Sequence, residues 1–500
     1  MTSLMTSLPA PQFRCLAGTA RRDITPPVGI YHRMWGAALH DQATGVHRPL
    51  TATVLRLQPQ PDAAGVQLTR AAAAQLLISL DHCILESSEM RALAAAAAAA
   101  SGLEPGQVLI TLTHTHGSGW MARSRSHLPG GQLIEPYLLQ LREQVAAAAA
   151  EATANMRPVT AVIGTGRCGL ARERDFFDSN RGHAVCGLNP AGQSDDTLLV
   201  ARLIDEARQT LAVIVNYACH PTTLAWDNTL ISPDYVGAMR ETVEHVVGGV
   251  CLFLQGASGD LGPREGFTGD TEVADRNGRE LGYAVLSALQ TLPEPGAQYT
   301  YQGPVLSGTW IGSWKYQAVT ESQLADHAAW NWHQLILEVP YRHDLPTIEE
   351  TLANREVWLA EERRVRELGD LQNEEELRNI RANTEQLTRQ LTRLEALAPG
   401  RCCPLQITLG ISGDALWVFT PGELYQVFQQ TLRQRFAPRP VFITTLTGDW
   451  QPGYIPPASS YGYGIYQEVI AATAPGSLEV LIEQIVRALR KQLGDLGGAV

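Results

Sequence analysis

Six short apolar runs predict buried β-strands. They read QLLISL, QVLITL, LAVIVNY, VCLFLQ, ALWVF and PVFITTL, and they begin at residues 75, 107, 211, 250, 415 and 440. Runs that are apolar throughout, without alternation, are typical of strands covered on both faces. Helical patterns separate them. The chain therefore predicts an α/β fold with a mixed or largely parallel sheet sandwiched by helices, and with an inserted helical hairpin.

The inserted hairpin is predicted from a different pattern. At residues 347–397, Leu, Ile and Val recur at spacings of three and four among Glu, Arg and Gln, which indicates amphipathic helices. We therefore divide the chain into a main domain, residues 1–345 and 399–500, and a helical arm, residues 346–398. The arm is expected to pack on the main body or on a second subunit, as in a homo-oligomer. No chemistry is assigned to it.

Polar side chains follow most of the predicted strands directly. They are Asp81, His82, His114, His116, His220, Asp260, Glu423, and Asp449 with Tyr454. Functional sites of α/β proteins lie at strand ends. One histidine at such a place is usually structural, but repetition at six strand ends favours a site.

The sequence Thr-His-Thr-His at residues 113–116 is the strongest metal-binding candidate. On an extended strand, residues two apart project from the same face, so His114 and His116 could reach one ion. A catalytic zinc site takes about three protein ligands and keeps one position open for water. His220 and Glu423 are candidates for the remaining ligands because each ends an apolar strand with a good donor.

Composition and charge narrow the class of protein. The chain has 500 residues, 45% of them apolar, and a formal net charge of −12. It has no long basic cluster, so nucleic acid is not an expected partner. No apolar stretch of about twenty residues predicts an integral membrane segment. The first residues lack the pattern of a secretory signal, which favours a cytoplasmic location, and the eight cysteines, without a C-x-x-C pair, are expected to be reduced thiols.

Eight short motifs resemble those of the neutral/alkaline non-lysosomal ceramidase family in order and approximate spacing. The motifs are RRDITPP at 21–27, THTHGSG at 113–119, NR at 180–181, NYACHPTT at 216–223, SPDYVG at 232–237, QGASGDLGP at 255–263, PGE at 421–423 and GYI at 453–455. The resemblance covers nearly the whole chain apart from the helical arm.

The resemblance implies a zinc hydrolase of an N-acyl amide bond, with zinc-activated water as the nucleophile. The implied zinc ligands are His114, His220, Glu423 and Tyr454. A second family tyrosine twelve positions after the ligand tyrosine corresponds to Tyr466. His116 resembles the histidine that lines the pocket and would exchange a proton. Arg181 resembles the arginine that faces the scissile group, where it and Tyr466 would donate to the developing oxyanion.

One difference from the family motifs leaves the substrate undetermined. The family motif reads G-D-V-S-P, whereas this chain has Gly262 in place of the serine. A serine nucleophile is therefore not expected, while a zinc-activated water survives the change. Two alternatives remain: a zinc hydrolase of a small non-ceramide amide, ester or lactone, and a non-catalytic relative that binds a metal or ligand. Asp234 and Asp260 also match family positions and are expected to brace loops or to touch substrate.

Overall fold

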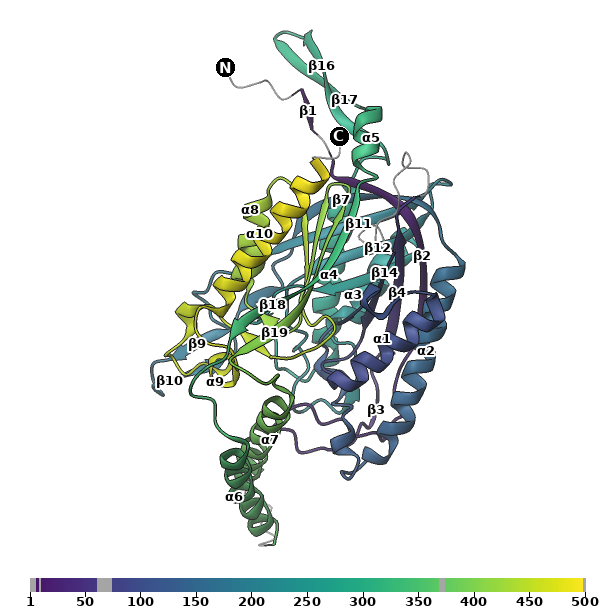
Figure 1. Ribbon diagram of the computed structural model, residues 1–500. Coiled ribbons are helices and arrows are strands. Elements are labelled where there is room, and N and C mark those ends of the chain that lie inside the picture. The colour runs from purple at the N-terminus through teal and green to yellow at the C-terminus, as the bar shows by residue number, and fades with distance from the viewer. Residues whose placement is uncertain (1–5, 9, 61–73, 368–373, 498–500) are drawn as a thin grey trace.

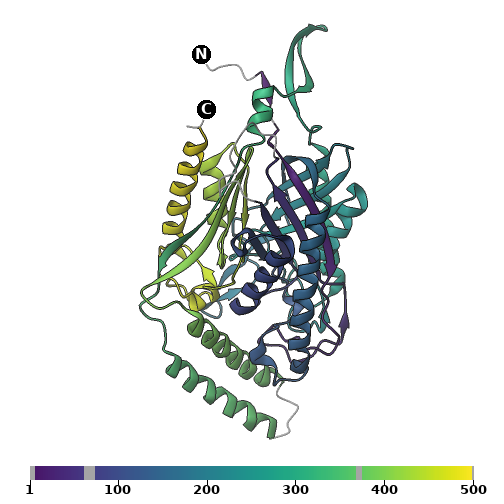
Figure 2. The ribbon, with the colours of Figure 1, turned by 45° about the vertical axis from the view of Figure 1, so that its right-hand side comes forward.

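The apolar runs form two β-sheets that pack face to face (Figures 1 and 2). The structure is a computed structural model that describes residues 6–8, 10–60, 74–367 and 374–497. Helices cover the outer face of each sheet, so the main body has four layers: helices, an eight-stranded sheet, a four-stranded sheet, and helices. Each sheet thus has helices on one face only, which differs from the single helix-covered sheet that the sequence predicts.

The larger sheet is mixed. Its strands, in spatial order, are β14 (Val250–Gln255), β12 (Thr210–Tyr217), β11 (Thr197–Asp205), β7 (Arg157–Arg167), β2 (Gln12–Asp23), β4 (Thr51–Gln58), β5 (Gln75–Leu80) and β6 (Val108–Leu112). Only β12–β14 and β5–β6 pair in parallel; the other five neighbouring pairs are antiparallel. The mixed sheet is therefore confirmed, and a largely parallel sheet is wrong.

The apolar runs reflect burial on both faces and carry no information on strand direction. In β12, Val213 and Val215 pack toward the helices, whereas Ala212 and Ile214 pack toward the second sheet. Such a strand is apolar at every position whichever way its neighbours run. Parallel pairs need a crossover connection, and helices provide it for both parallel pairs of this sheet.

The smaller sheet and the covering helices complete the layers. Its strand order is β18 (Trp330–Pro340), β19 (Cys402–Ser412), β20 (Ala415–Phe419) and β22 (Val441–Thr444). The helices over the larger sheet are α1 (Ser87–Ser101), α2 (Ile134–Ala154), α3 (Tyr235–Val247) and α4 (Thr271–Gln290), and those over the smaller sheet are α8 (Gln426–Phe436) and α10 (Ser477–Gly497).

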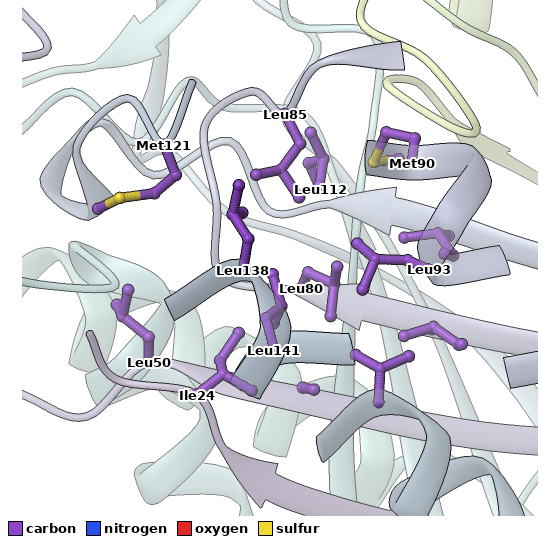
Figure 3. Packing of buried hydrophobic residues seen from close by; sticks show 14 of the residues in the cluster. Ile24, Leu50, Leu80, Leu85, Met90, Leu93, Leu112, Met121, Leu138 and Leu141 are labelled. Carbon is purple, nitrogen blue, oxygen red and sulfur yellow. The ribbon is translucent and has the colours of Figure 1, made fainter. Parts of the chain in front are cut away.

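Interlocking aliphatic side chains hold α1 and α2 on the larger sheet. Figure 3 shows Leu138 and Leu141 of α2 and Leu93 of α1 around Leu80 of β5. These side chains are fully buried, and burying a leucine stabilises a fold by about 1.5–3 kcal/mol. The packing fixes the carboxyl ends of β5 and β6, from which the candidate site begins.

Gly18 allows the closest approach between α2 and the sheet. A Cβ atom at Gly18 would lie 2.0 Å from the carbonyl oxygen of Ala152, a backbone atom that has no freedom to move away. We expect Gly18→Ala to lower the free energy of unfolding by about 1–3 kcal/mol, measured by urea denaturation. Gly187→Ala, where no atom lies within 4 Å of the new Cβ, is the control, and equal stabilities of the two variants would contradict the expectation.

The helical arm consists of α6 (Ile348–Glu367) and α7 (Glu374–Ala396), which lie side by side at one end of the molecule (Figures 1 and 2). Helix α7 packs on the main body. Arg381 donates to the carbonyl oxygen of Leu39 at 2.8 Å, and Glu385 accepts two 2.8 Å hydrogen bonds from Arg125. One face of α7 is therefore part of the interior.

Shorter elements complete the described structure. They are β1 (Ser7–Leu8), β3 (Gly45–Val46), β8 (Ala171–Glu173), β9 (Asp175–Asp178), β10 (His183–Cys186), β13 (Leu230–Ile231), β15 (Leu261–Pro263), β16 (Ala297–Leu306), β17 (Trp310–Ala318), α5 (Glu321–Asp326), β21 (Glu423–Leu424), β23 (Tyr454–Ile455) and α9 (Tyr466–Ile470). Within the described ranges, no helix combines the length and apolar content that crossing a membrane requires. All eight cysteines are free thiols.

Candidate metal centre

Three side chains from distant parts of the sequence meet in a buried cluster. The Nε2 atoms of His114 and His220 lie 3.0 Å apart, and Oε2 of Glu423 lies 3.2 Å from each of them. His114 follows β6, His220 follows β12, and Glu423 begins β21. All three side chains are buried. The structure thus brings together three of the four metal ligands that the sequence predicts, in a group able to hold an ion.

Backbone carbonyl groups orient both imidazole rings. Nδ1 of His114 lies 2.9 Å from the carbonyl oxygen of Cys83, and Nδ1 of His220 lies 2.8 Å from that of Ser258. A carbonyl oxygen only accepts, so both Nδ1 atoms carry the proton and both Nε2 lone pairs point into the cluster.

These converging donors need a cation between them. Glu423 Oε2 is buried and has no hydrogen-bond partner in the part of the chain that the structure describes. Two imidazole lone pairs and a carboxylate oxygen in mutual contact repel one another unless a positive charge lies among them. Two histidines and one glutamate are a ligand set of catalytic zinc sites that leaves a coordination position open. The residues present therefore fit Zn²⁺.

The pKa directions agree with this need for positive charge. Burial opposes ionisation of Glu423, but the imidazoles of His114 and His220 outweigh it and hold its pKa well below the usual value. Burial would also lower the pKa of His114, yet the neighbouring Cys83 and Glu423 raise it overall. Burial, Arg174 and His114 lower the pKa of His220 to about 3. The cluster is built around an ionised carboxylate.

Strand pairing places Tyr454 beside Glu423. The bridge between β21 and β23 is parallel and aligns these two residues, which are far apart in sequence. The Tyr454 hydroxyl lies 3.2 Å from His220 Nε2 and 3.0 Å from a guanidinium nitrogen of Arg174. Tyr454 therefore borders the cluster, and its role as a fourth ligand stays a prediction. Ligation by Tyr454 would require five coordination to admit a water or substrate atom.

His114 and His116 lie close together, but they do not belong to an extended strand as the sequence predicts. Strand β6 ends at Leu112, His114 has a φ of 69°, and a 3₁₀ turn spans His116–Ser118. A positive φ is uncommon for residues other than glycine and is often found at functional sites. The two ring centroids are nevertheless 5.1 Å apart. Backbone strain at His114 aims its ring.

His116 lines the wall of the site. Its ring packs on Trp35 with 4.8 Å between centroids, and neither ring nitrogen has a hydrogen-bond partner among the described residues. Burial, together with His114 and His220, lowers its pKa well below the usual value. His116 is therefore a neutral imidazole with a free lone pair.

A second group of possible ligands overlaps the first. Cys83, His114 and His116 also lie within reach of one ion. The Cys83 sulfur approaches Nδ1 of His114 at 3.6 Å, but that atom already donates to the Cys83 carbonyl. A metal at Nδ1 would have to displace this hydrogen bond, so the group with His220 and Glu423 is favoured.

The two other predicted catalytic residues have different positions. Tyr466, at the start of α9, lies beside Tyr454 with 5.9 Å between ring centroids. Arg181 lies in the turn between β9 and β10, where its side chain is 76% exposed and pairs with Asp178. The structure does not bring Arg181 to the cluster.

Arg174 is the arginine that reaches the cluster. It is buried, donates to Tyr454, and donates two hydrogen bonds, at 2.8 and 3.2 Å, to the carbonyl oxygen of Gly259. The sequence did not predict this position for Arg174. It lies seven residues before Arg181, and nothing in its local pattern distinguishes a buried arginine from an exposed one.

The two predicted aspartates brace the surrounding loops. Asp234 caps α3 by accepting from the backbone of Tyr235 at 2.7 Å, and burial raises its pKa to about 6. Asp260 accepts two hydrogen bonds from Gln426, at 2.7 and 2.8 Å, and burial raises its pKa to about 7. Both are tied to the protein itself.

A cavity of about 410 Å³ adjoins the cluster. One wall is aromatic and includes Trp35, Trp226 and Phe267, which pack edge to face or stacked on one another. The lining also includes Arg389 and Arg393 of α7. The sequence pattern of the arm predicted no chemistry, so these two arginines are the least predictable residues of the site.

Comparisons with known proteins identify solved structures of similar fold. The structure is similar to the crystal structure of neutral ceramidase from Pseudomonas aeruginosa, with a TM-score of 0.62 and 15% sequence identity over 96% of this chain and 74% of that chain. It is also similar to a ceramidase complexed with C2, with a TM-score of 0.61 and 15% identity over 97% and 76% of the two chains. No family model and no curated protein sequence matches the chain. The likeness is one of fold, and the buried cluster lies within it.

Proposed function

We propose that the chain is a zinc-dependent hydrolase that cleaves an N-acyl amide bond. The observation that carries the proposal is the buried cluster of His114, His220 and Glu423, which neighbours a cavity lined by His116 and Tyr454. The fold shared with neutral ceramidase supports the same reaction class, although a fold alone does not determine function.

Each residue of the site has a role in this reaction. Zinc in such a site polarises a carbonyl group and lowers the pKa of a water to about 7, which supplies a nucleophile at neutral pH. His114 and His220 hold their protons at Nδ1 and present Nε2 to the metal. His116 accepts a proton on a free ring nitrogen and returns it to the departing amine.

Arg174 and Tyr466 are placed to stabilise the developing oxyanion. Arg174 takes the role that the resemblance assigned to Arg181, because its guanidinium borders the cluster and lines the cavity. Preorganised donors of this kind contribute about 3 kcal/mol each to catalysis. Gly262, beside Arg174 and Thr222, has no hydroxyl, so the chain offers no serine there as a nucleophile.

The test is metal content combined with a substrate panel. Protein purified without chelator should contain close to one zinc per chain by mass spectrometry, and His114→Ala should contain none. The wild type should hydrolyse at least one member of a panel of N-acyl amides that includes ceramide, and esters of the same acids measure the preference for amide. A wild type that stays metal-free after zinc addition would refute the proposal.

A further inference from the structure

Arg393 is a buried cation without a partner. It lies on α7, lines the cavity beside the metal cluster, and is only 7% exposed. Among the described residues, no carboxylate, carbonyl or hydroxyl makes a hydrogen bond or ion pair with it. Arginine stays protonated in proteins, and burying an uncompensated charge is strongly unfavourable. An anion inside the cavity would compensate this charge.

The neighbouring groups do not supply that anion. Arg389, one turn earlier on α7, pairs with Glu385 at 2.9 Å, but Glu385 also binds Arg125. One carboxylate thus serves two guanidinium groups. Arg174, which also lines the cavity, has only neutral hydrogen-bond partners, Gly259 and Tyr454. The cavity walls therefore carry excess positive charge.

The other polar groups near Arg393 do not pair with it. Tyr454 and Tyr466 line the same cavity, and the Tyr454 hydroxyl contacts Arg174 and His220 instead. The Glu423 carboxylate belongs to the cluster, where its Oε2 lies 3.2 Å from Nε2 of each histidine. A compensating anion for Arg393 would therefore bind in the cavity that it lines.

We infer that the cavity binds a substrate carboxylate on Arg393, so that the hydrolysed amide belongs to an N-acyl amino acid. This inference rests on the proposed hydrolase function and names its substrate class. Guanidinium and carboxylate groups match in a bidentate pair. The Arg393 side chain passes 3.8 Å from the Cβ position of Gly453, the residue before Tyr454. Arg393 and Tyr454 line the same cavity, so a carboxylate on Arg393 and a carbonyl at the cluster can belong to one small molecule, as in an N-acyl amino acid, whose apolar acyl chain the aromatic residues receive.

The test compares two substrates that differ only in charge, N-octanoylglycine and N-octanoylglycinamide. The zinc-loaded wild type should prefer the acid by about a hundredfold in kcat/KM, the range expected of a hydrogen-bonded charge pair. Arg393→Met should remove most of this preference, and Arg393→Lys should restore part of it. The control Arg364→Met removes a charge from an exposed position on α6 and should leave the preference unchanged.

A binding measurement separates this inference from the proposed function. N-octanoylglycine should bind the chelator-treated, metal-free wild type in calorimetry, and Arg393→Met should weaken the binding by at least tenfold. Binding that Arg393→Met weakens in this way, together with no hydrolysis of either substrate, would support the carboxylate site and refute the proposed hydrolase function. Hydrolysis of both substrates without a preference for the acid, or a preference that Arg393→Met leaves intact, would overturn the carboxylate site and leave the hydrolase standing.

Discussion

Replacing Glu423 by glutamine should remove zinc binding and hydrolysis while the chain stays folded. Glutamine has the same shape, but it removes the only carboxylate from the His114–His220–Glu423 cluster. Changes to residues outside the ligand shell cost about 10–100-fold in metal affinity, so loss of a ligand charge should cost more. The amide nitrogen can donate to a histidine lone pair, which keeps the variant folded without metal.

Metal content and unfolding with added zinc measure this effect. Zinc at a hundred times its dissociation constant should raise the free energy of unfolding of the wild type by about 2.7 kcal/mol, and it should not stabilise Glu423→Gln. Glu241→Gln, which changes a carboxylate with a 61% exposed side chain on α3, should behave as the wild type does. One zinc per chain in Glu423→Gln would show that the metal is bound elsewhere.

Arg240→Met should lower the free energy of unfolding by about 3–5 kcal/mol, the cost of leaving a buried charge without its partner. Arg240 and Asp81 are both buried and form a bidentate pair with distances of 2.9 and 2.5 Å. Asp81 also accepts from Thr51 and from Thr113, the residue before His114. The variant leaves a charged carboxylate inside the core next to the metal cluster.

Urea denaturation should distinguish this pair from a surface one. Arg264→Met removes an arginine that pairs with Glu280 at the surface and should cost less than about 1 kcal/mol. Adding Asp81→Asn to Arg240→Met removes the stranded charge and should recover part of the lost stability. A cost for Arg240→Met no larger than that for Arg264→Met would contradict a role of the buried pair in stability.

The cluster residues were predictable because each lies in a short motif at the end of an apolar run. His114, His220 and Glu423 could be identified without any knowledge of which strands are neighbours, since a good ligand follows a buried strand in each case. Identifying these three residues did not require the strand directions, which the apolar pattern does not indicate. The backbone conformation at His114 was not predictable, because no sequence pattern indicates a positive φ at a histidine.

The arginines of the site were not predictable, for a different reason. Arg174 and Arg393 are buried by residues far along the chain, and a local pattern does not record such contacts. Glu385, Arg389 and Arg393 recur every four residues on α7. That spacing usually marks a solvated face stabilised by ion pairs within the helix. The packing of α7 on residues 33–41 and on Arg125 turns this stripe inward.

The helical arm joins the main body through a pair of adjacent strands. It is inserted between β18 and β19, which are antiparallel neighbours, and Pro340 and Cys402 face each other where the arm departs. An exchange of the arm would therefore leave both sheets and the His114–His220–Glu423 cluster untouched while replacing the part of the cavity lining that α7 supplies. Under the proposed function, evolution or engineering would then alter some substrate contacts without altering the cluster.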